Sequence, residues 1–269
     1  MKLEGKTAIV TGSSMGIGKS IAQHLAMNGA SVIINGRSMD KLEATLSEFK
    51  QAGYAVSAFN GDVSKTDDCK ELVAYAIAEY GGIDILVNNV GVGTRGYFEN
   101  INPVVFQQVL ISNVLGAVYP TLEALPHLKT SRGSVVFISS LAGLRGIPNA
   151  APYCMSKMAL TALAETLRVE LAMYGVHVGI VYVGMTKNDP EKKVLHADGS
   201  LANLQMHDSM FVDSPADTAR TVLKAIKGRS FKKVVGLKGK AYYWLQMLAP
   251  WVVDFSFKKG MKTIGEAQK

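Results

Sequence analysis

Residues 6–18 read Lys-Thr-Ala-Ile-Val-Thr-Gly-Ser-Ser-Met-Gly-Ile-Gly, a short apolar run followed by a loop that holds three glycines. The run at 6–10 predicts a buried β-strand, and residues 17–28 show the apolar spacing of a helix. Glycine lets the loop turn tightly and come close to a phosphate, and the free N–H groups of the following helix attract the phosphate charge. The stretch therefore predicts a phosphate-binding turn built from Gly12, Ser13, Ser14, Gly16, Ile17 and Gly18.

The alternation of strand and helix continues along the whole chain. Six further apolar runs predict strands at residues 32–35, 55–60, 83–88, 134–139, 176–183 and 233–237. Helical spacing recurs between them, at residues 39–52, 65–80, 103–129, 152–174 and 215–228. This order predicts an α/β fold, a single-domain, doubly wound Rossmann sheet of about seven parallel strands with helices on both faces.

Composition narrows the class of protein. With 48% hydrophobic and 19% charged residues among 269, the chain is expected to fold around a large core. Its two cysteines lie far apart and its histidines show no ligand spacing, so we expect neither a disulfide framework nor a metal site. The charged start does not resemble a signal peptide, and no apolar run reaches the ~20 residues of a spanning helix. We therefore expect a cytoplasmic protein.

The C-terminal end differs in charge from the rest. Residues 220–269 hold twelve Lys and Arg but only two acidic residues. This excess of positive charge indicates either a solvated chain end or a surface that binds an anionic partner. No recognition motif favours nucleic acid, so none is expected as a partner. Residues 241–253 are aromatic and apolar, with lysines on both sides. Segment 238–262 therefore either touches a membrane surface peripherally or packs against the substrate loop or a second subunit.

Tyr153 and Lys157 lie four residues apart in a predicted helix, which puts both side chains on one face. An ammonium beside a phenol favours the phenolate and lowers the pKa of the phenol from about 10 toward neutrality, as a general acid and base requires. Ser140 directly follows the predicted strand 134–139, and strand carboxyl ends form the ligand crevice of a doubly wound sheet. The three residues therefore predict a site of proton transfer.

The spacing Thr-Gly-x-x-x-Gly-x-Gly at 11–18, together with Tyr153 and Lys157, resembles the short-chain dehydrogenase/reductase family over roughly residues 5–237. The resemblance implies a catalytic tetrad of Asn113, Ser140, Tyr153 and Lys157. In it, Ser140 would stabilise the substrate oxygen, Lys157 would hold the nicotinamide ribose, and Asn113 would hold a water of a proton relay. The resemblance makes 1–237 the dinucleotide-binding and catalytic domain and 238–269 an extension. It also implies a homodimer or homotetramer through helices 103–129 and 152–174.

The resemblance implies a nicotinamide cofactor, and the end of the second strand indicates which one. Enzymes that use NAD place an acidic residue there, which accepts hydrogen bonds from the ribose. Here Gly36 is followed by Arg37 and Ser38, so nothing repels a 2′-phosphate and an arginine can bind it. We therefore expect NADP(H), with Ser13 and Ser38 as additional hydroxyl donors. The other cofactor contacts implied by the family fall on Asp62, Val63, Asn89, Gly91, Tyr153, Lys157 and Thr186.

The substrate is expected to be covered by loop 187–212, whose apolar residues either line a hydrophobic pocket or simply pack on the body. The long tail resembles that of steroid and ketosphinganine reductases. Together these features predict an NADP(H)-dependent oxidoreductase that interconverts a ketone and a secondary alcohol on a hydrophobic, steroid- or keto-lipid-like substrate. The alternatives are a 3-oxoacyl thioester reductase and, in another class, a non-catalytic NADP(H)-binding sensor or scaffold.

Overall fold

The computed structural model describes residues 3–187, 192–203 and 212–267. Its centre is a seven-stranded sheet in the order β10-β7-β6-β4-β1-β2-β3, and every pair in it is parallel. This confirms the predicted doubly wound sheet. The strands are β1 (Thr7–Val10), β2 (Ser31–Gly36), β3 (Val56–Asn60), β4 (Ile85–Asn88), β6 (Ser134–Ser140), β7 (His177–Val183) and β10 (Lys232–Val234).

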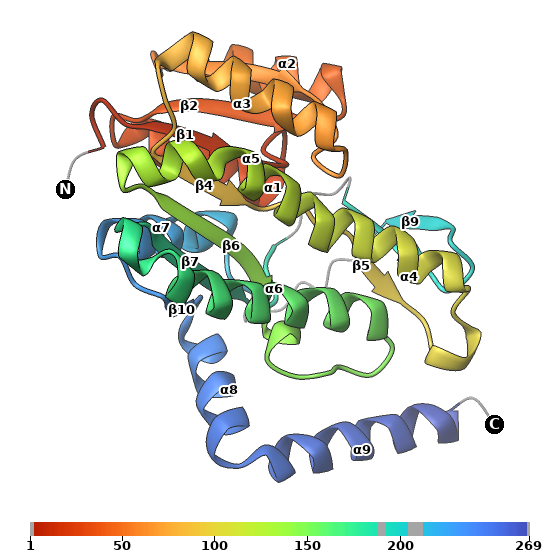
Figure 1. Cartoon of the computed structure of the whole chain (residues 1–269). Coiled ribbons are helices and arrows are strands. Elements are labelled where there is room, and N and C mark those ends of the chain that lie inside the picture. Colours follow the sequence, from red (N-terminus) through yellow and green to blue (C-terminus); the bar gives the residue numbers. More distant parts are fainter. Residues whose placement is uncertain (1–2, 188–191, 204–211, 268–269) are drawn as a thin grey trace.

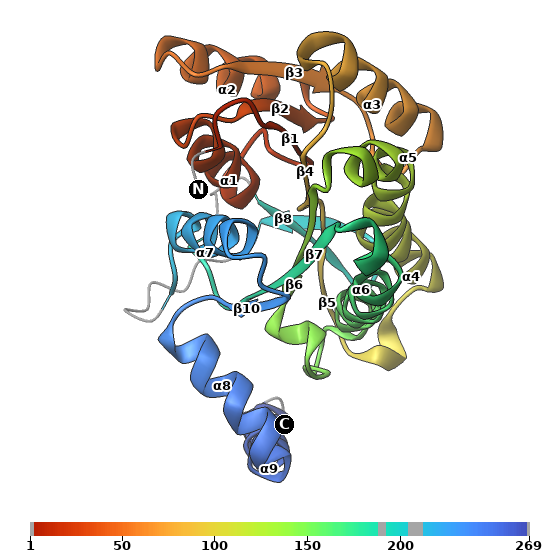
Figure 2. The ribbon, with the colours of Figure 1, turned by 60° about the vertical axis from the view of Figure 1, so that its left-hand side comes forward.

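Helices cover both faces of the sheet (Figures 1 and 2). On one face lie α1 (Gly16–Met27), α2 (Met39–Gln51) and α7 (Pro215–Lys227), and on the other lie α3 (Thr66–Tyr80), α5 (Gly116–Ser131) and α6 (Ala151–Glu170). In β1, Ala8 and Val10 belong to the first core and Ile9 to the second. The strands are apolar on both faces because each face is covered by helices.

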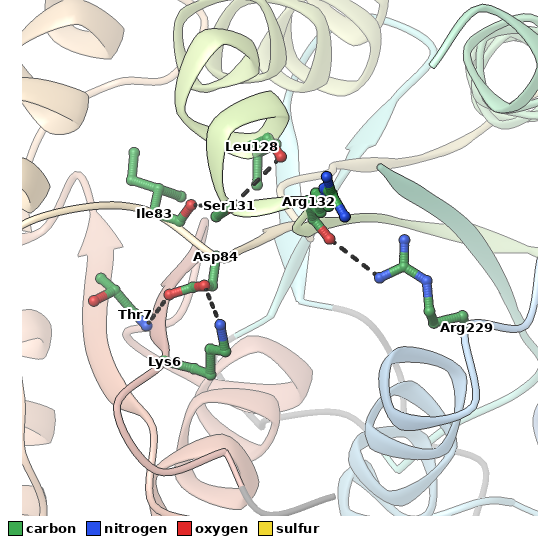
Figure 3. Close-up of polar contacts among 8 residues, drawn as sticks. All are labelled: Lys6, Thr7, Ile83, Asp84, Leu128, Ser131, Arg132 and Arg229. Atoms are coloured by element: carbon green, nitrogen blue, oxygen red, sulfur yellow. Dashed lines mark hydrogen bonds and ion pairs between the residues drawn. The ribbon is translucent and has the colours of Figure 1, made fainter. Parts of the chain in front are cut away.

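Polar contacts tie the strands and helices together at the amino-terminal edge of the sheet (Figure 3). The Asp84 carboxylate, just before β4, accepts hydrogen bonds from Lys6 Nζ at 2.7 Å and from the Thr7 N–H at 3.0 Å. The Ser131 hydroxyl at the end of α5 donates to the Ile83 carbonyl at 2.9 Å. These contacts fix the ends of β1 and β4, whose opposite ends form the crevice described below.

Three short strands form a second sheet that the sequence did not predict. β5 (Gly93–Arg95) pairs in parallel with β8 (Lys193–His196), and β8 pairs antiparallel with β9 (Leu201–Asn203). Part of the predicted substrate loop 187–212 is therefore ordered as strand. Residues 188–191 and 204–211 of that loop lie outside the described residues.

The predicted helix 103–129 is interrupted. α4 (Pro103–Leu110) continues into a π-helical turn, η2 (Ile111–Leu115), and then into α5. Together they span 29 residues and are long and apolar enough, by composition, to cross a membrane, contrary to the expectation that no segment is. One face of this helix packs in the core through Val105, Ala117 and Leu128, as in the helix layer of a soluble fold.

The C-terminal end is helical, and the strand before it ends earlier than the sequence predicts. The predicted strand 233–237 ends at Val234, because Gly236 turns the chain with φ +69° and α8 (Leu237–Leu248) begins at once. α9 (Pro250–Ala267) follows, and Figure 1 shows α8 leading away from the sheet and α9 running across below the body of the protein. Arg145 holds them by donating to Gln246 Oε1 at 2.9 Å and by an ion pair with Asp254. Large apolar side chains on them stay exposed, among them Trp244, Leu248, Trp251 and Phe255.

Candidate active site

A cavity of about 780 Å³ opens at the carboxyl ends of β1, β2, β4, β6 and β7. The strand order changes direction beside β1, and this is where doubly wound sheets bind ligands. The predicted glycine loop lines one end of the cavity. Ser140, Tyr153 and Lys157 line the other end. The structure therefore brings the two predicted halves of the site into one space.

The glycine loop is packed most tightly at Gly18, while the backbone angles of Gly12 and Gly16 favour glycine. A Cβ at Gly18 would lie 2.2 Å from the Gly12 carbonyl oxygen and 2.5 Å from Asn89 Nδ2. Gly12 and Gly16 have φ of +61° and +56°, which favour glycine. Asn89 Nδ2 donates to the carbonyls of Thr11 and Gly12, each at 3.0 Å, and so fixes the loop against β4. Asn89 thus positions the loop in addition to lining the cavity.

Ser13 does not take its predicted place. Its side chain is fully buried and does not line the cavity. Its hydroxyl donates to the Val10 carbonyl at 2.6 Å and accepts from the Asn35 N–H at 2.9 Å. Because both partners belong to the protein, the hydroxyl fastens the loop to β2 and is not turned toward a phosphate. Ser14, Gly16 and Ile17 do line the cavity, as expected.

The end of β2 and the start of the chain after β3 lie beside the glycine loop, where Gly36 approaches Ser14. Gly36, Arg37, Ser38, Asp62 and Val63 all line the cavity. The Arg37 side chain is 76% exposed, and its guanidinium lies 3.5 Å from the Asp62 carboxylate. Burial raises the pKa of Asp62, but hydrogen bonds from Ser64 and the Arg37 charge outweigh it and hold this pKa below its ordinary value. Asp62 is therefore ionised at neutral pH.

Tyr153 is held in its protonated form. Burial raises the pKa of the phenol, while a hydrogen bond from the Ser140 side chain lowers it by a smaller amount. This differs from the predicted shift toward neutrality, because desolvation of the phenolate dominates. Ser140 Oγ also accepts from the Ala142 N–H at 3.2 Å, which orients the hydroxyl at the end of β6.

Lys157 lies beside Tyr153, as its spacing predicted. Its Nζ is 5.8 Å from the centre of the Tyr153 ring and donates to the Ile138 carbonyl at 3.0 Å. Burial lowers its pKa to about 7, and the charge of Lys192 adds to the shift. A Cβ at Gly91 would come within 3.1 Å of Nζ, so the close approach of Gly91 shapes the lysine site.

Asn113 lies in η2, fully buried behind the cavity wall. Its Oδ1 accepts from the Val92 N–H at 2.7 Å, and its Nδ2 donates to the Val92 carbonyl at 3.0 Å. Nδ2 also donates to Ser156 Oγ at 2.9 Å, which links Asn113 to the helix of Tyr153 and Lys157. The structure thus joins all four tetrad residues, with Asn113 fixing the chain between β4 and β5.

Thr186 lines the cavity, and its hydroxyl donates to the Gly184 carbonyl at 3.4 Å. A single β-bridge with Asp213 holds it in place. Among the cavity-lining residues to which the sequence assigned no role are Asn35, Arg95 and Lys192. Asn35 ends an apolar strand and Lys192 lies in the predicted substrate loop 187–212, and these were the available signals. Arg95 carried none, because arginines usually lie in solvent.

Comparison with known proteins places the chain in a family. The model of the short chain dehydrogenase family matches residues 6–198. An 11-beta-hydroxysteroid dehydrogenase-like protein (4A) of Arabidopsis thaliana is 32% identical over 93% of this chain and 82% of its own length. Dehydrogenase/reductase SDR family member 4 of Sus scrofa is 36% identical over 70% of this chain and 68% of its own.

Solved structures agree with this placement. A dehydrogenase/reductase from Sinorhizobium meliloti superposes with a TM-score of 0.76 at 28% identity, over 87% of this chain and 94% of its own. An alcohol dehydrogenase from Thermococcus sibiricus, complexed with 5-hydroxy-NADP, gives a TM-score of 0.75 at 25% identity, over 86% of this chain and 95% of its own.

Proposed function

This chain belongs to the short chain dehydrogenase family, and on that premise we propose that it is an NADP(H)-dependent oxidoreductase that interconverts a ketone and a secondary alcohol. The observation that carries the proposal is the common cavity. The glycine loop stands at one end of it, and Tyr153, hydrogen-bonded to Ser140 and flanked by Lys157, stands at the other.

The residues present fit a dinucleotide. No side chain caps the amino end of α1, so its first N–H groups remain available to a diphosphate where Gly16, Ile17 and Gly18 line the cavity. A Cβ at Gly18 would collide with the Gly12 carbonyl and with Asn89, and a Cβ at Gly12 would lie 3.0 Å from Val90, so the backbone itself forms the wall of the cradle. Asp62 would accept a hydrogen bond from an adenine amino group, and Thr186 would contact a carboxamide.

The choice of NADP(H) over NAD(H) rests on Arg37. β2 ends in Gly36, so the strand end holds no carboxylate that could accept hydrogen bonds from the ribose hydroxyls. The Arg37 guanidinium is exposed at the cavity and has the fork geometry that binds a phosphate. Asp62 lies close to the Arg37 guanidinium, so the guanidinium would bind a phosphate either while it stays in contact with Asp62 or by exchanging Asp62 for the phosphate.

In the reductive direction the protein supplies orientation and a proton. The bound cofactor supplies the hydride for the carbonyl carbon. Tyr153 donates its phenolic proton to the carbonyl oxygen, and its raised pKa keeps that proton available. Ser140 donates a hydrogen bond to the same oxygen and stabilises its developing charge. Lys157 holds the ribose and, when charged, stabilises the phenolate that Tyr153 leaves behind.

The substrate is proposed to be largely hydrophobic. Met185, Val194 and Val212 line the cavity, and the related Arabidopsis protein is named as 11-beta-hydroxysteroid dehydrogenase-like. A 3-oxoacyl thioester reductase and a non-catalytic NADP(H) sensor are the alternatives. A screen of steroids, long-chain keto lipids and a 3-oxoacyl thioester separates them, since a sensor would turn over none.

Substitution of Tyr153 by Phe tests the chemistry. Turnover should fall about 100- to 10,000-fold, because the proton donor is lost. The affinity for NADPH should change less than about twofold, as measured by the fluorescence of the cofactor itself, since both tryptophans lie in the tail. Tyr174→Phe, at an exposed tyrosine beyond α6, is the matched control. Full turnover in Tyr153→Phe would refute the mechanism.

We propose a homodimer or homotetramer built on α4, α5 and α6, and a cytoplasmic protein whose tail touches anionic membrane. Exposed apolar side chains on these helices support the first proposal, namely Val104, Ile111, Leu122, Met155 and Met158. Sedimentation of Leu122→Glu should show a smaller species than wild type.

The exposed Trp244 and Trp251 support the proposed membrane contact of the tail, and phosphatidylserine vesicles should sediment wild type better than Trp251→Ser.

A further inference from the structure

The catalytic end of the cavity is positively charged. Arg95, Lys187 and Lys192 line the cavity together with Lys157. Among the described residues that line the cavity, the single acidic one is Asp62, at the opposite end beside Arg37. The catalytic end therefore presents cations without a carboxylate of its own in the described parts of the chain.

Lys192 is the cation whose charge acts on Lys157 of the tetrad. It directly precedes β8, whose Val194 and Leu195 are buried and pair with Gly93 and Thr94 of β5. β5 is in turn held by the two hydrogen bonds from Asn113 to Val92. A chain of backbone and side-chain contacts thus connects Lys192 to the tetrad.

The environment of Lys192 is unfavourable for an unpaired ammonium. Burial lowers its pKa, and its charge in turn contributes to the lowered pKa of Lys157. Two ammonium groups in one partly dry cavity repel each other and lose hydration, a cost that an anion between them would offset. The hydroxyl of Thr94, which lines the same wall, is buried and has no hydrogen-bond partner among the described residues.

We propose that the substrate is an amphipathic acid and that Lys192 binds its carboxylate or phosphate. This inference rests on the proposed function, and it makes Lys192 the specificity-determining residue of the site. Arg95, at the outer edge, and the Thr94 hydroxyl complete the anion site. Both residues also line a second cavity of about 500 Å³, which adjoins the first one. The apolar part of the substrate lies along Val194 and Val212.

A matched pair of ketones tests the proposal: para-acetylbenzoate and its methyl ester differ by one charge. The wild-type holoenzyme should prefer the carboxylate in kcat/KM. In Lys192→Met the carboxylate-to-ester ratio should fall about 10- to 100-fold, the value of a charged hydrogen bond. Lys193→Met is the control, because Lys193 is exposed on β8 and does not line the cavity. Its ratio should equal that of wild type.

Calorimetry supplies an arm without turnover. Para-acetylbenzoate should bind NADP-loaded wild type at least about tenfold more tightly than NADP-loaded Lys192→Met. An equal carboxylate preference in both proteins, or none in wild type, would overturn the proposal.

The cofactor diphosphate is the other anion that Lys192 could meet. If Lys192→Met loses NADPH affinity by the same factor as it loses the carboxylate, the lysine binds the cofactor and the proposal is wrong. If wild type does not bind NADPH at all, the proposed function fails instead. Binding of para-acetylbenzoate to the free protein, compared with Lys192→Met, then still decides the role of Lys192.

Discussion

Replacing Asn113 by Ala should destabilise the protein far more than most polar-to-alanine changes. The substitution removes three hydrogen bonds, to Val92 N, Val92 O and Ser156 Oγ, at distances between 2.7 and 3.0 Å. Ser156 keeps its bond to the Tyr153 carbonyl, so the two groups of Val92 lose most. At about 1–3 kcal/mol for each of the two Val92 groups left without a partner, the free energy of unfolding should fall by about 2–6 kcal/mol.

The same change should loosen the wall behind the tetrad. Val92 leads directly into β5, and Gly91 before it lies against Lys157 Nζ. Turnover should therefore fall along with stability, and the loss should extend to the carboxylate preference conferred by Lys192.

Urea unfolding followed by circular dichroism measures the effect, because both tryptophans lie in the tail and report poorly on the core. Asn102→Ala is the matched control. Asn102 is exposed and its side chain accepts one bond, from the Val104 N–H at the start of α4, so its loss should cost about 1 kcal/mol. Equal costs for the two variants, or a cost below about 1 kcal/mol for Asn113→Ala, would refute the reasoning.

Three further outcomes are expected. Arg37→Ala should weaken NADPH binding about tenfold or more and leave NADH binding unchanged; equal losses for both cofactors would remove Arg37 as the phosphate ligand. Gly18→Ala should abolish NADPH binding, since its Cβ would meet the Gly12 carbonyl oxygen at 2.2 Å. Gly16→Ala, with φ +56° and open space around it, should cost only about 1 kcal/mol of stability. A larger effect of Gly16→Ala than of Gly18→Ala would contradict the packing of the loop. The pKa of Lys157 is lowered from 10.5 to about 7, so above about pH 7 the folded protein releases this proton while the unfolded chain keeps it, and stability should rise with pH. The rise should be less steep in Lys192→Met, where the pKa of Lys157 is higher. Identical pH slopes in the two proteins would contradict the coupling between the two lysines.

The main sheet and the cofactor loop were predictable from sequence because each rests on local signals. Strands buried on both faces leave continuous apolar runs, and a close backbone approach requires glycine, as at Gly18. The second sheet was not predictable, since β5 and β9 hold three residues each and depend on pairing between distant segments. Such short strands carry no periodicity of their own.

In the site, residue types were easier to predict than their environments. The prediction that Tyr153 and Lys157 lie beside each other was correct. Sequence does not reveal, however, that burial outweighs the neighbouring charge in setting the pKa of the phenol. The sequence also does not show where the Ser13 hydroxyl points, and in the structure it donates to the Val10 carbonyl rather than facing the cavity. Lys192 looked like a loop lysine, since its burial arises only when β8 pairs with β5.

The π-helical turn Ile111–Leu115 sets the rotational phase between α4 and α5. A π turn accommodates about one residue more than an α turn, and one residue corresponds to about 100° of rotation about the helix axis. Deleting a single residue there would barely shorten the helix, but it would swing Val105 and Val109 of α4 away from Leu195 of β8. The extra residue thus acts as an angular spacer that aims α4 at the strand following Lys192, and insertions or deletions in this turn are a direct way to retune the substrate end.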